Sequence, residues 1–255
     1  MLRRLTRWVM VIPLLAVLAS GCGSDDSEGS AGGGKLTVFA AASLTETFTR
    51  LGKTFEQSHP GVKVTFNFGS SATLAQQITQ GAPVDVFAAA SPATMKTVTD
   101  AGLATAPTTF ARNKLQIAVP ADNPAKIDAL ADLANPKVKV ALCAKQVPCG
   151  AAAAKALDAA GLKVTPVTYE QDVKATLTKV ELGEVDAALV YATDVLASGG
   201  KVKGIAFPEA DKAVNDYPIV TLTKAPAPDL AKRFVTLVLS TQGKDVLARA
   251  GFQAP

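Results

Sequence analysis

Short apolar runs rich in β-branched residues alternate with longer amphipathic, alanine-rich segments from residue 36 to the end of the chain. Apolar residues at strand spacing predict strands, and apolar residues at helical spacing predict helices. The first part of this pattern predicts strands over 36–41, 62–68 and 84–88 and helices over 44–58, 72–80 and 92–101. The turn residues Pro60-Gly61 and Gly81-Ala-Pro83 end the first two helices.

A second series of the same kind follows. Asn113–Pro120 is predicted as a strand that leaves the first unit, and Tyr217–Thr223 as one that returns to it. The remaining pattern predicts helices over 127–134, 150–160, 173–182, 228–240 and 242–250 and strands over 137–142, 164–168, 186–190 and 202–207. This alternation is typical of an α/β fold with mainly parallel strands. We expect two lobes, the first formed by 35–114 and 218–255 and the second by 115–217, with a ligand cleft at the strand carboxyl ends.

The first 34 residues differ from the rest of the chain. A basic segment over 1–7, an apolar run over 8–18 and small residues before Cys22 predict a signal peptide over 1–21, too short to span a membrane. Cys22 after Ser-Gly resembles the lipobox of bacterial lipoproteins, although Leu18 lies one position earlier than is most usual. The alternative is ordinary secretion with Cys22 as a free thiol. Residues 22–34 have no apolar side chain larger than alanine beyond Cys22 and predict a flexible tether.

Lipidation of Cys22 would place the protein outside the cytoplasm, anchored to the outer face of the cell membrane without spanning it. Loss of the signal peptide removes three arginines, so the net charge falls from +4 to about +1. No basic stripe remains, which argues against nucleic acid as a partner. The single tryptophan, Trp8, is lost as well, which leaves a composition poorly suited to stacking on sugars or bases.

Two further cysteines, Cys143 and Cys149, flank a loop that contains Pro148. In an exported protein this spacing favours a structural disulfide. A redox-active pair is a weaker interpretation because the C-x-x-C spacing is absent. A zinc site would need more ligands, and the single histidine, His59, is predicted at the exposed end of the first helix.

Serines occupy the predicted starts of two helices. Ser43 follows the strand over 36–41, and Ser70 and Ser71 follow Gly69 after the next strand. A helix N-terminus offers unpaired N–H groups and about half a positive charge, which suits an oxyanion. Neither start carries Lys or Arg, so the pattern favours a neutral site that binds an anion without reacting with it. Each serine could instead be only an N-cap.

Six segments stand in order along the chain: 38–44, 69–78, 81–90, Val147-Pro-Cys-Gly150, Gln171-Asp-Val173 and 188–194. Together they resemble the periplasmic molybdate-binding proteins of ABC importers, which are type II solute-binding proteins. The resemblance spans residues 36–255. It implies a two-lobed α/β fold with the ligand in the interlobe cleft, molybdate or tungstate as ligand, and no cofactor or catalysis. The implied partners are a membrane permease and its ATPase, and the implied state is a monomer.

The resemblance also implies the binding residues, which hold the oxyanion through neutral donors. These are Ser43 and Ser71 by hydroxyl and backbone N–H, Tyr191 by its phenol, and Cys149 and Val173 by backbone N–H. Molybdenum is then bound as its oxyanion, with no direct coordination by side chains. None of the five positions carries a carboxylate, so a protonated anion such as hydrogen phosphate should be disfavoured.

Three flanking interpretations accompany this set. Asp172 is expected to cap the helix behind Val173, Asp194 is expected to cap a following short helix, and Tyr191 could simply be a packed residue at a strand end. Two other functions compete with the leading one. The first is a receptor for sulfate or another small oxyanion on the same fold. The second is a hydrolase that uses Ser43 or Ser71, which would need a nearby base and lacks a Gly-x-Ser-x-Gly elbow.

Overall fold

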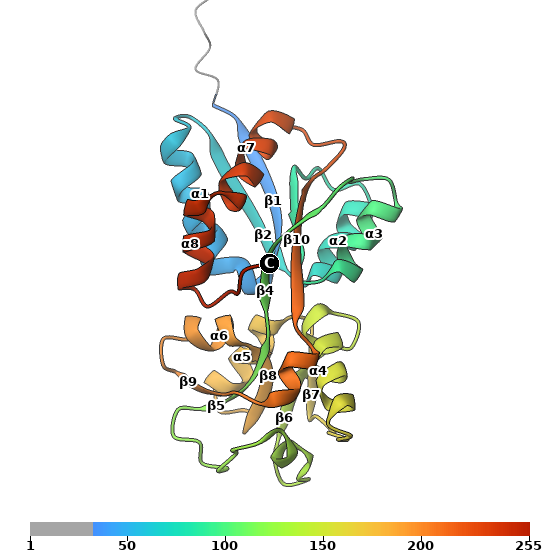
Figure 1. Cartoon of the computed structure of the whole chain (residues 1–255), viewed down its shortest axis with the longest axis vertical. Helices are drawn as coiled ribbons and strands as arrows, with labels where there is room; N and C mark the ends of the chain where they lie inside the picture. The colour runs from blue at the N-terminus through green and yellow to red at the C-terminus, as the bar shows by residue number, and fades with distance from the viewer. Residues whose placement is uncertain (1–32) are drawn as a thin grey trace, which may run out of the picture. The chain divides into compact units, whose positions relative to one another are not determined.

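The computed structural model describes residues 33–255, which form two five-stranded sheets flanked by helices (Figure 1). The predicted signal peptide, Cys22 and most of the predicted tether lie outside this range. We call the sheet that contains β1, with its helices, lobe 1, and the other sheet, with its helices, lobe 2. No helix within 33–255 has the length and apolar character needed to cross a membrane.

The lobe 1 sheet has the strand order β2-β1-β3-β10-β4. Its strands are β1 (Lys35–Ala41), β2 (Lys63–Gly69), β3 (Val86–Ala88), β4 (Thr108–Asn113) and β10 (Asn215–Thr221). Its helices are α1 (Thr45–Ser58), α2 (Ser71–Thr79), α3 (Pro92–Asp100), α7 (Pro228–Leu239) and α8 (Thr241–Arg249), and a 3-10 turn, η1 (Ala42–Leu44), precedes α1. Phe48 and Phe55 on one face of α1 pack against Phe234 of α7 and bury the apolar stripe that predicted the helix.

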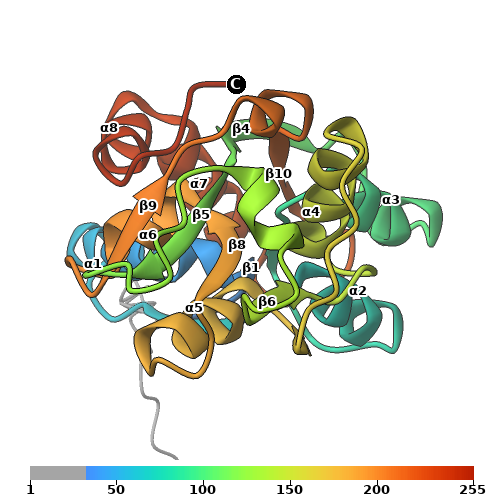
Figure 2. The same ribbon diagram turned by 90° about the horizontal axis from the view of Figure 1, so that it is seen from below.

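The lobe 2 sheet has the strand order β7-β6-β8-β5-β9, and helices α4 and α5 flank it (Figure 2). Its strands are β5 (Leu115–Pro120), β6 (Val140–Cys143), β7 (Thr168–Glu170), β8 (Ala187–Tyr191) and β9 (Val202–Ile205). Its helices are α4 (Pro148–Ala159), α5 (Val173–Glu181) and α6 (Ala192–Ala197), with 3-10 turns η2 (Leu130–Ala134) and η3 (Pro208–Lys212). The sheet residues and the inward faces of α4 and α5 share one apolar core.

The α/β fold with mainly parallel strands is confirmed, since in each sheet only one strand, β10 in lobe 1 and β5 in lobe 2, runs against the other four. In lobe 1, β1 pairs in parallel with β2 and β3, and β10 pairs antiparallel with β3 and β4. In lobe 2, β6 pairs in parallel with β7 and β8, and β5 pairs antiparallel with β8 and β9. Strand β5 begins directly after the first passage between the lobes, and β10 begins directly after the second. Each therefore enters its sheet from the end that faces the other lobe and runs opposite to the parallel strands.

The chain passes between the sheets twice, at Lys114 between β4 and β5 and again just before Asn215. The strands β4 and β10 lie side by side where they approach lobe 2 (Figure 1). The strand expected over 113–120 is confirmed over Leu115–Pro120, which forms β5 of lobe 2, but its first residue, Asn113, ends β4 of lobe 1. The expected lobe boundary after residue 217 stays a prediction, although β10 already pairs within lobe 1 from Asn215.

Two other elements differ from expectation. The helix predicted over 127–134 is only the 3-10 turn η2, because the Asp132 carboxylate accepts hydrogen bonds from the N–H groups of Asp128 and Ala129 and Asn135-Pro136 ends the turn. The strand predicted over 164–168 lies at β7 instead, because Pro166 has no N–H to donate to a ladder.

Candidate functional site

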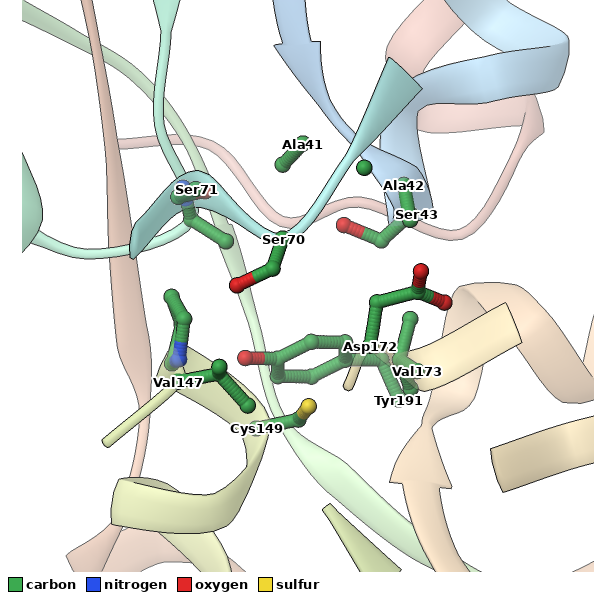
Figure 3. Close-up of a pocket in the computed structure, with 13 residues that line it drawn as sticks. Ala41, Ala42, Ser43, Ser70, Ser71, Val147, Cys149, Asp172, Val173 and Tyr191 are labelled. Carbon is green, nitrogen blue, oxygen red and sulfur yellow. The ribbon is translucent and has the colours of Figure 1, made fainter. Parts of the chain in front are cut away.

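The parallel strands of both lobes end at one small cavity. In lobe 1, the lining residues end or follow β1 and β2 or follow β3; in lobe 2, they follow β6 and β7 or end β8. The cavity volume is about 20 Å³. A single water needs roughly 10–15 Å³ by the same kind of measure, so the space suits a small ion and excludes a sugar or a peptide. All five residues predicted to bind the ligand, together with Ser70, line this cavity (Figure 3).

Ser43 lies in the turn η1, buried, directly after β1. Its Oγ is 2.9 Å from the phenolic oxygen of Tyr217 on β10. Burial raises the pKa of Tyr217, so its phenol stays protonated and can donate to Ser43. The Ser43 proton is then free for a ligand. The interpretation of Ser43 as only an N-cap is wrong, because α1 begins at Thr45 and receives no side-chain cap.

Ser70 and Ser71 lie at the start of α2, as the sequence predicted. Ser71 is the first helical residue, and its Oγ accepts a hydrogen bond of 2.9 Å from the N–H of Ala90 after β3. The Ser71 proton therefore remains available. Ser70 occupies the N-cap position, yet its side chain makes no capping bond. Its Oγ is buried and has no hydrogen-bond partner among residues 33–255.

Lobe 2 presents backbone amides at the starts of two helices. Cys149 is the second residue of α4, after Pro148, and Val173 is the first residue of α5. In α4, the first N–H group that donates to an acceptor of the helix or its cap is that of Ala151, which donates to Val147 O. In α5, it is that of Ala175, which donates to the Asp172 carboxylate. The N–H groups of Cys149 and Val173 precede these and have no acceptor within their own helices. The predicted cap is confirmed, since the Asp172 carboxylate accepts a 3.0 Å bond from Ala175 N–H.

The disulfide between Cys143 and Cys149 is confirmed, with a Cα–Cα distance of 5.8 Å. It joins the end of β6 to the first turn of α4. Cys143 Sγ also lies 3.2 Å from Thr176 Oγ1 on α5. A Cβ at Gly150 would overlap the carbonyl oxygen of Ala144, so the turn packs directly against the loop before it. These contacts fix the direction of the Cys149 N–H.

Tyr191 ends β8 and is almost fully buried. Its phenolic oxygen accepts a 3.0 Å bond from Asn215 Nδ2, and the same amide group donates a 2.6 Å bond to Ala90 O in lobe 1. Burial raises the pKa of Tyr191, so the phenol is neutral and keeps a proton that the bond from Asn215 does not use. The packed-residue interpretation holds as well, since the ring contacts Tyr217 edge-on at 6.0 Å between centroids.

Sequence reasoning missed Asn215 and Tyr217, which hold Tyr191 and Ser43 in place from β10. The returning strand was predicted only from Tyr217, so Asn215 lay outside it, and Tyr217 was given no role at the site. One signal was present: Asn215 and Tyr217 are two positions apart, so they share one face of the strand.

The cavity has no basic lining residue in the part of the chain that the structure describes, and Asp172 is its one charged member. The expectation of a lining without a carboxylate therefore holds for the five predicted positions but not for the whole cavity. Asp172 is partly exposed and belongs to lobe 2, and its carboxylate lies on the side of the cavity where Ser43 is (Figure 3).

A cluster of three charged residues, of which only Asp194 is fully buried, lies at the start of α5. Asp194 Oδ2 accepts a 3.3 Å bond from the Tyr191 N–H, which confirms its predicted capping role at α6. Burial raises the pKa of Asp194 to about 6, and nearby Lys174, 3.4 Å from Oδ1, opposes this shift. Burial lowers the pKa of Lys174, but Asp194 and Glu46 outweigh that effect, so it is raised overall. Lys174 also pairs at 2.8 Å with Glu46 on α1, across the two lobes.

No group of three metal-ligating side chains occurs within 33–255. His59 ends α1 as predicted, but it is half-buried and not exposed, because its ring stacks on Phe55 at 4.1 Å. It does not line the cavity. The serines there have no neighbouring histidine to act as a base.

Comparison with known proteins gives three findings. A family model described as bacterial extracellular solute-binding protein matches residues 36–253. A molybdate-binding protein ModA of Mycobacterium bovis is 42% identical over 98% of this chain and 100% of its own length. A putative ABC transporter substrate-binding lipoprotein of Bacillus subtilis is 32% identical over 93% of this chain and 94% of its own length.

One solved structure supports the architecture. The periplasmic molybdate-binding protein of Azotobacter vinelandii matches with a TM-score of 0.75 at 22% sequence identity, covering 86% of this chain and 99% of that one. At that identity the match establishes the fold.

Proposed function

Because this chain belongs to the family of bacterial extracellular solute-binding proteins, we propose that it captures molybdate between its lobes and delivers it to an ABC importer. The importer would supply the permease and the ATPase. The observation that carries the proposal is the cavity where neutral hydroxyl and amide donors from both lobes meet without a basic residue. Relatives that share this ancestry and are named for molybdate binding support the choice of anion.

The donor set suits a doubly charged tetrahedral ion. A dianion that loses its water needs dense compensation, because burial of an unpaired charge is very costly. The starts of α2, α4 and α5 each contribute about half a positive charge. Hydrogen bonds to a charged acceptor add about 1.5–3 kcal/mol each. Five to seven such bonds are consistent with a Kd near or below about 1 μM after the ordering costs of binding.

The family assignment identifies a transport protein and not an enzyme. The cavity agrees with this, since neither Ser43 nor Ser71 has a histidine or lysine next to it among the lining residues of the described chain. The hydroxyls of both serines instead contact Tyr217 and the N–H of Ala90.

Isothermal titration of the purified protein with molybdate, tungstate, sulfate and phosphate tests the proposal. We expect tight binding of molybdate and also of tungstate, which has the same charge and shape. Sulfate should compete weakly, and phosphate should bind least because the donors offer its proton no dedicated acceptor. Tighter binding of sulfate than of molybdate would favour the alternative receptor, and phosphate binding would assign an acceptor role to Asp172.

Ser43→Ala provides the matching variant. It removes one hydroxyl from the cavity and should weaken molybdate binding tenfold or more. Ser58→Ala at the exposed end of α1 is the control and should bind as the unmodified protein does. Unchanged affinity in Ser43→Ala would remove Ser43 from the site.

We further propose that the protein is a monomer held at the outer face of the cell membrane by a lipid on Cys22. The sequence around Cys22 and the relative named as a lipoprotein support this. Cys22→Ser should release the protein from the membrane fraction, and light scattering of the released protein should give the monomer mass. Retention in the membrane fraction would rule out the anchor.

A further inference from the structure

Ser70 differs from the other hydroxyl groups at the cavity. Ser43 contacts Tyr217, Ser71 accepts from the Ala90 N–H, and Tyr191 accepts from Asn215. Each of these oxygens is therefore held by a protein partner. Ser70 Oγ has none within residues 33–255, although the residue is only 7% exposed. A buried polar group without a partner is rare in folded proteins and calls for a physical explanation.

Ser70 also lacks the hydrogen bond that its position at the start of α2 would normally provide. Serine at an N-cap usually accepts a hydrogen bond from an N–H in the first helical turn. Ser91 does so for α3 and Ser240 for α8, through Thr94 N–H and Gly243 N–H. Ser70 has the same position at α2 but makes no such bond. Its hydroxyl points instead into the space between the two lobes (Figure 3).

We propose that Ser70 is a further binding residue, whose hydroxyl donates directly to the oxyanion beside the donors of Ser71. The inference rests on the proposed function of the cavity and deepens it. Because Ser70 does not cap α2, the first N–H groups of that helix also remain free to face the anion. The start of α2 then supplies two adjacent hydroxyls, whereas the turn after β1 supplies one.

The proposal predicts that substitution of Ser70 lowers the affinity for the ligand without lowering the stability of the free protein. Replacing a true N-cap serine lowers the stability of the free protein. Replacing Ser70 removes a buried oxygen that has no partner, so the free protein should lose no stability. The loss should appear only when the ligand is present.

Titration of Ser70→Ala with molybdate and thermal unfolding without the ligand test this. We expect about a tenfold loss of affinity, equivalent to about 1.4 kcal/mol, and a melting temperature no lower than that of the unmodified protein. Ser70→Gly also lacks the hydroxyl while glycine is tolerated at N-caps, so it should lose affinity to a similar extent. Ser240→Ala is the matched control, and it should melt at a lower temperature with unchanged affinity.

Three results would contradict the inference. Affinity of Ser70→Ala within twofold of the unmodified protein would show that the hydroxyl does not contact the anion. A fall in melting temperature like that of Ser240→Ala would show that Ser70 is an ordinary cap. If the unmodified protein binds none of the four anions, both the proposed function and the role of Ser70 are contradicted. If it binds one of the other anions in place of molybdate, only the proposed ligand is wrong, and the Ser70 variants are then compared with that anion.

Discussion

The two lobes contribute to the cavity in different ways. Lobe 1 offers the side-chain hydroxyls of Ser43, Ser70 and Ser71, at the ends of two neighbouring parallel strands, in addition to the free N–H groups at the start of α2. Lobe 2 offers the backbone N–H groups of Cys149 and Val173, with one phenol from Tyr191. A hydroxyl donor can be removed by a single substitution, whereas a backbone donor survives almost any change of side chain.

The scaffolds behind these donors differ accordingly. In lobe 1, the hydroxyls of Ser43 and Ser71 are held by neutral hydrogen bonds to Tyr217 and Ala90. The lobe 2 amides depend on the direction of the backbone, which the disulfide at α4 and the ion pair between Lys174 of α5 and buried Asp194 help to hold. We therefore expect anion binding by lobe 1 to depend on its side chains. In lobe 2, we expect stability to depend on pH and on reductants, and anion binding to depend on its backbone N–H groups.

The largest expected effect concerns Asp194. Its pKa of about 6 in the folded protein exceeds the ordinary value of 3.8 because of burial, so the folded state holds the proton more tightly than the unfolded state. The free energy of unfolding should therefore fall as pH rises from about 4 to 6, by at most about 3 kcal/mol, and level off above that range. Asp194→Asn removes this contribution and keeps an oxygen for the Tyr191 N–H.

Urea denaturation of both proteins without ligand at several pH values measures the difference. The stability of Asp194→Asn relative to the unmodified protein should increase between pH 4 and pH 6. Parallel pH profiles would show that Asp194 does not titrate in this range and that lobe 2 has no special sensitivity to protons.

Val173→Pro tests the amide donors directly. Proline is tolerated at the first helical position, and Asp172 before it already has an extended backbone, with φ −154° and ψ 174°. The substitution removes the N–H and should weaken anion binding roughly 10- to 100-fold, the loss of one hydrogen bond to a charged acceptor. Calorimetry measures the change. Val173→Ala keeps the N–H and should bind much more tightly than Val173→Pro; equal affinities would exclude this amide.

Removal of the disulfide should affect stability more than affinity. The double variant Cys143→Ala with Cys149→Ala opens a loop of roughly seven residues. Closure of such a loop lowers the entropy of the unfolded chain and stabilises the folded protein by about 2 kcal/mol. For a protein of this size we expect a melting temperature lower by roughly 4–8 °C. The Cys149 N–H is retained, so the affinity should fall less than in Val173→Pro. A reductant should lower the melting temperature of the unmodified protein and leave the variant unchanged; the opposite pattern would contradict a stabilising role.

The smallest effect is expected for the ion pair between Glu46 and Lys174, which joins α1 to α5 across the lobes. The Glu46 side chain is half exposed, and exposed pairs contribute about 0–1 kcal/mol. Glu46→Gln should therefore change anion affinity less than about fivefold, and the difference should shrink in high salt. A tenfold change that persists in salt would mean that lobe closure depends on this pair.

The sequence by itself determined the features that arise from local interactions. Helical and strand spacing predicted most elements, the loop around Pro148 predicted the disulfide, and serines after strands marked two helix starts that line the cavity. Motif resemblance supplied the amide positions at Cys149 and Val173. These features depend on residues close together in the chain, which is why periodicity and turn chemistry can identify them.

The tertiary structure decided which groups meet. Ser43 and Tyr217 are 174 positions apart, and Asn215 and Ala90 are 125 apart, so their contacts depend on the order of strands in the sheet. The same order puts residue 113 and residue 115 in different lobes, which the apolar pattern alone joined into one strand. Only the packed structure shows that Ser70 turns away from its helix, because capping and ligand binding use the same residue type at the same position.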